Sequence, residues 1–335
     1  MRRLEEAPVM KRFVRRAISA VCAGALALAV PAARAQTPAL TPVTFTIIAP
    51  NASEWPVLIA KQQGFFRDEG LDVAIVSAGT PPNVMNAVAT NAANLGDTGS
   101  DTAIAAIVHG LAVKIVAPIF TVNPFALVVP PSIKSWSDLR GKQVVLASKQ
   151  DVTAMSFAGM AAKNHAKMDD FSITLSGDSS ARYAALASGN VAGAMLAQPF
   201  DLEAEAHGMH ALDTSYATMK DWMFKSVFVN SAWADANRGT VVKVLRALRT
   251  AIRFGYAQRE PTVAVLIDAT HASAAIAQST YDLDFGTWHA FDPNLKMNER
   301  GLLNVAQAQV AFGVLTALPK IGDLYDGSFA AAAAR

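Results

Sequence analysis

The chain has 335 residues, of which 52% are hydrophobic and 17% are charged. This composition excludes an intrinsically disordered protein, and the length leaves room for two domains. The formal net charge of +2 is small. Which partners this charge favours depends on where the basic residues lie along the chain.

The positive charge gathers in a segment typical of a secretory signal peptide. Four basic side chains between Lys11 and Arg16 precede the apolar run 17–30, which is too short to cross a bilayer. The run leads to an A-x-A site at Ala33-Arg34-Ala35. We predict cleavage after Ala35 and a periplasmic location, with Met1 and Met10 both open as the start.

Removal of residues 1–35 changes the charge and the cysteine content. These residues hold seven basic and two acidic side chains, so the remainder has 22 basic and 25 acidic ones. A slightly acidic chain gives no reason to expect nucleic acid or an anionic membrane as a partner. The only cysteine, Cys22, also leaves, which excludes disulfides and thiol chemistry in the mature chain.

Strands and helices alternate from Val43 onward. Val43–Ala49 is rich in β-branched residues, which predicts a buried strand, and Trp55-Pro56 is typical of a helix start. Leu95–Ala106 predicts a short strand, a polar turn and a helix that ends before Gly110. The alternation indicates right-handed βαβ units around a parallel sheet. Further strands are predicted at 71–77 and 112–119, and further helices at 57–67 and 81–91.

The same layout recurs about 100 residues later. Asp101 and Pro199 each open a helix, and they lie 98 residues apart, as do Gly110 and Gly208, which follow the two helices. Side-chain identity between the copies is poor, so the repeat is one of layout, and it predicts two similar α/β lobes. The second copy has predicted strands at 142–147, 171–175, 191–196 and 209–212, with helices at 154–165, 179–188 and 199–207.

A helical tail follows the second copy. A strand at 222–230 and helices at 232–259, 262–271, 274–279 and 298–315 are predicted there. We expect the chain to cross between the lobes near 121–125 and again near 222–228. The predicted organisation is a signal peptide at 1–35, a first lobe starting with 36–122, a second lobe at 127–222, a return to the first lobe at 227–329 and a disordered tail at 330–335.

Three segments resemble those of a known family. They are Gly64–Val73 (GFFRDEGLDV), Ile133–Val145 (IKSWSDLRGKQVV) and Gly189–Pro199 (GNVAGAMLAQP). The chain resembles the periplasmic substrate-binding proteins of ABC importers, in the NMT1/THI5-like branch that carries nitrate, sulfonate, taurine and thiamine-precursor binders. It departs from the family pattern at Ala192-Gly193, where aspartate is usual.

The resemblance implies an α/β, bilobal type II periplasmic binding protein fold, which the layout repeat predicts independently. It implies a monomer without catalysis or cofactor that encloses a small polar molecule by hinge closure and delivers it to an ABC permease. A ligand-presenting subunit of a membrane sensor stays open as an alternative. A pyrimidine-precursor enzyme of the same fold is disfavoured because the mature chain has no cysteine.

Four loops should face the cleft if the lobes meet at the carboxyl ends of their strands. In the first loop, Trp55 either stacks on the ligand or fixes the start of its helix in the core. Lys149 is the one plausible cation of these loops, with a solvated lysine as the other interpretation. The candidate ligand-binding residues are Ser53, Glu54, Trp55, Ser100, Asp101, Ser148, Lys149, Asp151, Thr153, Gln198 and Phe200, with Asn123 and Phe125 at the first crossover.

Asp101 leaves the charge of the ligand open. A helix N-terminus favours an anion by about 0.3–1 kcal/mol, whereas Asp101 would repel one. The side chain either caps its helix and faces away from the cleft, or it selects a ligand with N–H donors or a positive charge. No metal site is expected, because His207 and His210 are not completed by a carboxylate pattern.

Overall fold

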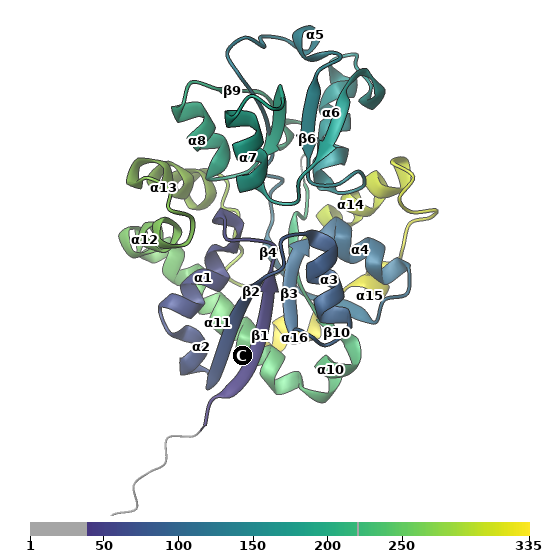
Figure 1. Ribbon diagram of the computed structural model, residues 1–335. Helices are drawn as coiled ribbons and strands as arrows, with labels where there is room; N and C mark the ends of the chain where they lie inside the picture. The colour runs from purple at the N-terminus through teal and green to yellow at the C-terminus, as the bar shows by residue number, and fades with distance from the viewer. Residues whose placement is uncertain (1–38, 220) are drawn as a thin grey trace, which may run out of the picture. The chain divides into compact units, whose positions relative to one another are not determined.

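The β-branched runs of the sequence form two five-stranded sheets in the computed structural model (Figure 1). The structure describes residues 39–335 except Lys220. The predicted signal peptide, its cleavage site and the two possible starts therefore lie outside the described residues. The α/β class and the two-lobe organisation predicted from the sequence are confirmed.

The first sheet is mixed, with strand order β2-β1-β3-β10-β4. Strand β1 pairs in parallel with β2 and β3, and β10 runs antiparallel between β3 and β4. Its strands are β1 Thr41–Ile47, β2 Leu71–Ser77, β3 Leu95–Gly99, β4 Val113–Phe120 and β10 Lys225–Asn230.

The second sheet repeats this arrangement in the order β7-β6-β8-β5-β9. Strand β6 pairs in parallel with β7 and β8, and β5 runs antiparallel between β8 and β9. In each lobe the antiparallel strand follows directly after the chain has crossed from the other lobe. The strands are β5 Ala126–Val129, β6 Gln143–Leu146, β7 Ser172–Leu175, β8 Gly193–Leu196 and β9 His210–Thr214.

Polar side chains cap some helices of the two lobes. Thr80 accepts a hydrogen bond from Asn83 N before the Pro81-Pro82 start of α3, and Asp151 caps α6. The first lobe has the 3-10 turn η1 Ala52–Glu54, α1 Trp55–Gln62, α2 Phe65–Asp68, α3 Pro81–Ala89 and α4 Ser100–Val108. The second has α5 Trp136–Leu139, α6 Val152–Lys163, the turn η2 Met168–Asp170, α7 Ser179–Ala187, α8 Phe200–Ala206 and α9 Ser215–Thr218.

The C-terminal helices pack on the first lobe. Helix α11 contacts α1 and α2, and α14 contacts α4. No helix within residues 39–335, Lys220 aside, has the length and apolarity needed to span a membrane. These elements are α10 Ser231–Ala236, α11 Arg238–Ala257, α12 Arg259–Thr270, α13 Ala274–Tyr281, the π-helical turn η3 Asp282–Thr287, α14 Glu299–Ala311, α15 Ile321–Leu324 and α16 Ser328–Ala333.

Three expectations about the helices are wrong. The helix predicted at 57–67 is divided at Gly64, which has φ +83°, a conformation that glycine adopts without strain. The helix predicted at 232–259 is divided at Asn237. The tail predicted to be disordered forms α16, because Phe329 is fully buried beneath the Arg238 guanidinium, 4.3 Å from the ring centre, and Ala333 O accepts a hydrogen bond from Arg249.

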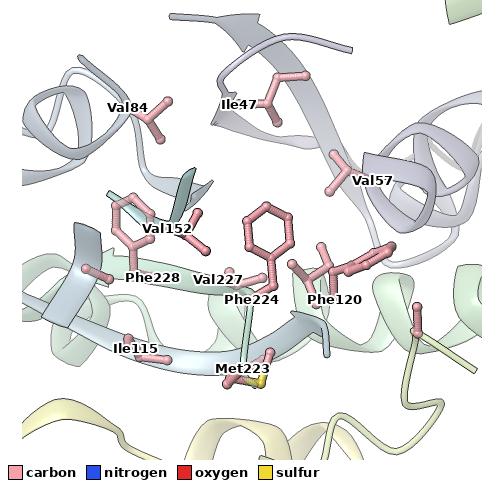
Figure 2. Packing of buried hydrophobic residues seen from close by; sticks show 14 of the residues in the cluster. Ile47, Val57, Val84, Ile115, Phe120, Val152, Met223, Phe224, Val227 and Phe228 are labelled. Carbon is pink, nitrogen blue, oxygen red and sulfur yellow. The ribbon is translucent and has the colours of Figure 1, made fainter. Parts of the chain in front are cut away.

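One hydrophobic cluster extends from the first sheet to α6 of the second lobe. Figure 2 shows Phe224 and Phe120 within this cluster, together with Val152 at the start of α6. The rings of Phe224 and Phe120 meet edge to face with centroids 6.0 Å apart. Apolar packing therefore continues from one lobe to the other where the chain crosses between them.

Candidate functional site

A cavity of about 60 Å³ lies between the carboxyl ends of the strands of the two lobes. Its walls follow β1 and β3 in the first lobe and β6, β7 and β8 in the second, which is where ligands bind in open α/β sheets. The lining residues are Ile48, Asn51, Ser53, Pro81, Gly99, Asp101, Thr102, Phe125, Ala147, Asp151, Val152, Thr153, Gly177, Asp178, Ser179, Arg182, Ala197, Phe224 and Lys225.

Asp101 reaches across the cavity to the other lobe. Its Oδ2 accepts a hydrogen bond of 2.9 Å from the backbone N–H of Val152, at the start of α6, and the residue is 2% exposed. Burial and the nearby Asp151 carboxylate raise the pKa of Asp101 to about 7, although backbone N–H groups oppose this shift. The side chain therefore does not face away from the cleft, and the first lobe helps to cap a helix of the second.

Asp151 caps the same helix from within its own lobe. Its Oδ1 accepts hydrogen bonds from Thr153 N at 3.1 Å, Ala154 N at 3.3 Å and Thr153 Oγ1 at 2.6 Å. Burial raises the pKa of Asp151 and outweighs these bonds and the Arg182 charge, which lower it, so the net shift is upward. Two acidic side chains, one from each lobe, thus meet at the N-terminus of α6.

Arg182 is a cavity residue that the sequence did not reveal. It is 2% exposed, and its guanidinium lies 5.9 Å from the ring centre of Phe125. Burial lowers its pKa to about 10. Its N–H groups donate to the Met195 carbonyl at 2.6 Å, to the Ser176 and Gly177 carbonyls at 2.9 and 3.1 Å, and to Ser179 Oγ at 2.8 Å.

Lys225 also lines the cavity, at the start of β10, and it too was missed. Its Nζ lies 2.7 Å from Asp97 Oδ1 and donates a hydrogen bond to Glu54 Oε1. All three residues are at most 2% exposed. Burial lowers the pKa of Lys225, but the Asp97 and Glu54 charges outweigh it and the net shift is upward. Burial and Asp97 raise the pKa of Glu54 well above its usual range.

Five of the thirteen candidate residues line the cavity. These are Ser53, Asp101, Phe125, Asp151 and Thr153. Ser53 is held by Asn51, whose Oδ1 accepts hydrogen bonds from Ser53 N at 2.9 Å and Ser53 Oγ at 2.6 Å. All five were chosen because they follow strand ends or a crossover, and the fold brings them together for that reason.

Four of the remaining candidates are buried away from the cavity. Trp55 packs in the core, where its Nε1 donates to Thr262 O at 2.9 Å and its ring meets Phe285 edge to face. Ser100 Oγ shares a hydrogen bond of 2.6 Å with Ser226 Oγ. Glu54 lies behind Lys225 and contacts it, and Asn123 Nδ2 donates to Ser156 Oγ at 2.9 Å.

The other four candidates face elsewhere. Ser148 lines an adjoining groove beside α3, which shares Asp101 and Asp151 with the cavity, and Lys149 is exposed. Gln198 Nε2 donates to Asp201 Oδ2 at 2.6 Å, and its backbone carbonyl accepts a 3.4 Å hydrogen bond from Ala52 N of the first lobe. Phe200 lies beside the Tyr183 ring, with centroids 6.4 Å apart. None of these eight residues lines the cavity.

Within residues 39–335, Lys220 aside, no three His, Cys, Asp or Glu side chains come together in a way that would hold a metal ion. No histidine is among the cavity-lining residues. The chemistry of the described site is therefore that of carboxylates, two buried cations, hydroxyls and two aromatic rings.

Solved structures of several proteins share this fold. The ligand-binding component of an ABC-type import system from Staphylococcus aureus is 12% identical, with a TM-score of 0.74 over 87% of this chain and 98% of its own. The periplasmic aliphatic sulphonate-binding protein SsuA from Escherichia coli is 18% identical, with a TM-score of 0.66 over 84% and 94%. The desulfurization enzyme DSZB is 13% identical, with a TM-score of 0.67 over 88% and 98%.

Sequence comparison gives the family. None of the curated protein sequences compared with this chain matches it. The family described as NMT1/THI5 like matches residues 51–264, which include every cavity-lining residue except Ile48. The chain belongs to the NMT1/THI5-like family, as its sequence motifs indicated.

Proposed function

We propose that the protein is the solute-binding component of an ABC importer. It captures a small polar molecule between its lobes and delivers it to a permease in the inner membrane. The observation that carries this proposal is the cavity at the strand ends, with polar and aromatic side chains from both lobes. A ligand held there touches both lobes at once and stabilises their closed arrangement.

Direct hydrogen bonds join the lobes at the cavity, and a ligand that touches both lobes adds its contacts to them. These hydrogen bonds include those from Val152 N to Asp101 Oδ2, at 2.9 Å, and from Ala52 N to Gln198 O, at 3.4 Å. A hydrogen bond contributes about 0.5–1.5 kcal/mol net. Micromolar binding corresponds to about −8 kcal/mol, so ligand contacts exceed what these two bonds supply.

The cavity favours binding over catalysis. The Ser53 hydroxyl donates to Asn51 and the Thr153 hydroxyl to Asp151, and no described histidine lies beside either hydroxyl in the cavity wall. Nucleophilic catalysis by a hydroxyl needs an adjacent base that accepts its proton. Asp151 is the base beside Thr153, and its Oδ1 is engaged in capping α6 through Thr153 N and Ala154 N. Although one enzyme shares this fold, we propose that this protein performs no reaction.

Transport by this route also requires export. The basic segment, the apolar run 17–30 and the site at Ala35 are typical of a cleaved signal peptide. We propose that the mature protein begins at Gln36 and acts in the periplasm as a monomer. Mass measurement of the intact protein from its native host tests the cleavage position.

The ligand itself tests the function. Protein purified from its native host is denatured and the released small molecules are identified by mass spectrometry. The compound found should raise the melting temperature of the ligand-free protein, since a ligand at 100 times its Kd adds about 2.7 kcal/mol of stability.

Two variants test whether the ligand that raises the melting temperature binds in the cavity. Phe125→Ala should weaken the ligand-induced shift, because Phe125 lines the cavity, whereas Leu318→Ala, at a side chain 50% exposed and outside the cavity, should not. If no small molecule is released and no compound in an extract of the host raises the melting temperature, the proposed function is wrong.

A further inference from the structure

The charges that line the cavity do not balance. Three carboxylates face it, from Asp101, Asp151 and Asp178, against two cations, from Arg182 and Lys225. The numbers alone do not identify a ligand, because each charge could already be paired within the protein. The contacts of each side chain decide which charges remain available.

Lys225 is paired with acids, whereas Arg182 is hydrogen-bonded to neutral acceptors. Lys225 is held between Glu54 and Asp97, two buried acids that match and exceed its single charge. Arg182 uses four of its five N–H groups on acceptors of the second lobe. A guanidinium bound in this way cannot present the two parallel N–H groups that grip a sulfonate or carboxylate.

The three carboxylates face a single uncompensated cation, Arg182, whose charge acts on Asp151 and Asp178 without a direct ion pair. None of them forms an ion pair with any lysine, arginine or histidine that the structure describes. Asp101 is 2% exposed and Asp151 6%, so solvent gives them little screening. Their backbone partners leave acceptor capacity, since a carboxylate has about four lone-pair sites. What the cavity lacks is positive charge and N–H donors.

The apolar part of the wall fits the same kind of ligand. Phe125 and Phe224 line the cavity with their rings edge to face, 5.4 Å between centroids. Aromatic faces attract cations and accept the apolar part of an organic molecule. The volume of about 60 Å³ corresponds to roughly four to six water-sized spheres at 10–15 Å³ each, so the closed cavity fits a compact molecule.

We propose that the ligand is a small organic cation with N–H donors, an alkylammonium or a guanidinium type, whose charge pairs with Asp101 and Asp151 while its apolar part lies against Phe125 and Phe224. This assignment rests on the proposed solute-binding role of the cavity. It separates the protein from the sulphonate-binding protein of the same fold, because an anion here would meet three carboxylates and one guanidinium whose N–H groups are largely occupied.

Calorimetric titration with matched probes tests the ligand class. Ethylammonium and guanidinium are compared with ethanesulfonate and nitrate at constant ionic strength and pH 8. The cations should bind and the anions should not. Asp101→Asn, which keeps the shape and an oxygen for the Val152 N–H, should weaken cation binding tenfold or more. Asp169→Asn removes an exposed acid of the second lobe, outside the cavity, and should leave binding unchanged.

The wild-type protein supplies a second measurement in case Asp101→Asn fails to fold. A cation competes with the proton on Asp101, whose pKa is about 7, so guanidinium affinity should fall severalfold from pH 8 to pH 6. The other titratable groups that line the cavity are Asp151, Asp178, Arg182 and Lys225. Protonation of Asp151, whose pKa is also raised, would act in the same direction, and Arg182 and Lys225 keep their charges over this range.

The outcomes separate this inference from the proposed function. Binding of ethanesulfonate or nitrate, or equal cation affinity in wild type and folded Asp101→Asn, overturns the cation assignment and leaves solute binding intact. If no probe binds, the charge of the native ligand decides: a cation supports the assignment, and an anion or neutral molecule overturns it. Absence of any ligand overturns both proposals.

Discussion

Replacement of Lys225 by methionine should be among the most destabilising single changes in the first lobe. Lys225 Nζ lies 2.7 Å from Asp97 Oδ1 and contacts Glu54, and all three side chains are at most 2% exposed. Methionine fills a similar volume but removes the charge. Two fully buried acids, Glu54 and Asp97, then lie close together without a cation.

The expected cost follows from that arrangement. Removal of one partner from a buried ion pair costs about 3–5 kcal/mol, because the remaining charge is left uncompensated. Burial and Asp97 already raise the pKa of Glu54, so acid favours its neutral form in the folded protein. The cost should therefore be largest near pH 8 and smaller near pH 5, where protonation relieves part of the repulsion.

Urea unfolding followed by circular dichroism at pH 5 and pH 8 measures this cost. Lys142→Met, at an exposed lysine, is the matched control and should change stability by less than about 0.5 kcal/mol. The triple variant Lys225→Met, Glu54→Gln, Asp97→Asn should recover much of the loss, since no unpaired charge remains. A cost below about 1 kcal/mol for Lys225→Met, or one independent of pH, would refute the reasoning.

Two further changes test other parts of the fold. Burial raises the pKa of Asp201 to about 7 from 3.8. A raised acid pKa means that stability is present at low pH and is lost as the pH rises through about 4 to 7, by up to about 4 kcal/mol at 1.36 kcal/mol per unit. Asp201→Asn should flatten the pH dependence of urea unfolding over this range; an unchanged slope would contradict the assignment. In α11, Gly255→Ala should destabilise by about 1–3 kcal/mol, because a Cβ there would lie 2.5 Å from Phe285 Cε1. Gly239→Ala, on the same helix with open space around it, is the control and should stabilise slightly. Equal changes in the free energy of unfolding for the two variants would show that the Phe285 ring moves aside at no cost, contrary to this expectation.

The order of strands and helices could be predicted because most core strands are long enough to show β-branched composition. Strand β5, Ala126–Val129, could not: it has four residues between two prolines, and no strand was predicted between the crossover at 121–125 and the strand at 142–147. The division at Asn237 also escaped prediction, because the apolar face of the long helix is continuous in sequence. Docking of α16 depends on Arg238 and Arg249 of α11, a contact that no local pattern reveals.

The candidate site was predicted only where position relative to a strand end was sufficient. Asp101, Asp151 and Thr153 qualify, since each follows a strand. Arg182 does not, because a single arginine on a short helix resembles an exposed residue, and its acceptors come from other elements. Lys225 had a usable signal that was not used: a charged residue inside the apolar run WMFKSVFVN must be compensated when the strand is buried.

The position of β10 determines the order in which the two sheets can be completed during folding. All strands of the second sheet come from one continuous segment, residues 126–214, whereas the first sheet needs β10, from residues 225–230, between β3 and β4. Long-range pairing is slow because the intervening chain must be ordered first. In pulsed hydrogen exchange, amides of β6 and β8 should gain protection before those of β3 and β10; the reverse order would contradict this expectation. A chain truncated before β10 would leave β3 and β4 with unpaired edges, which are templates for aggregation.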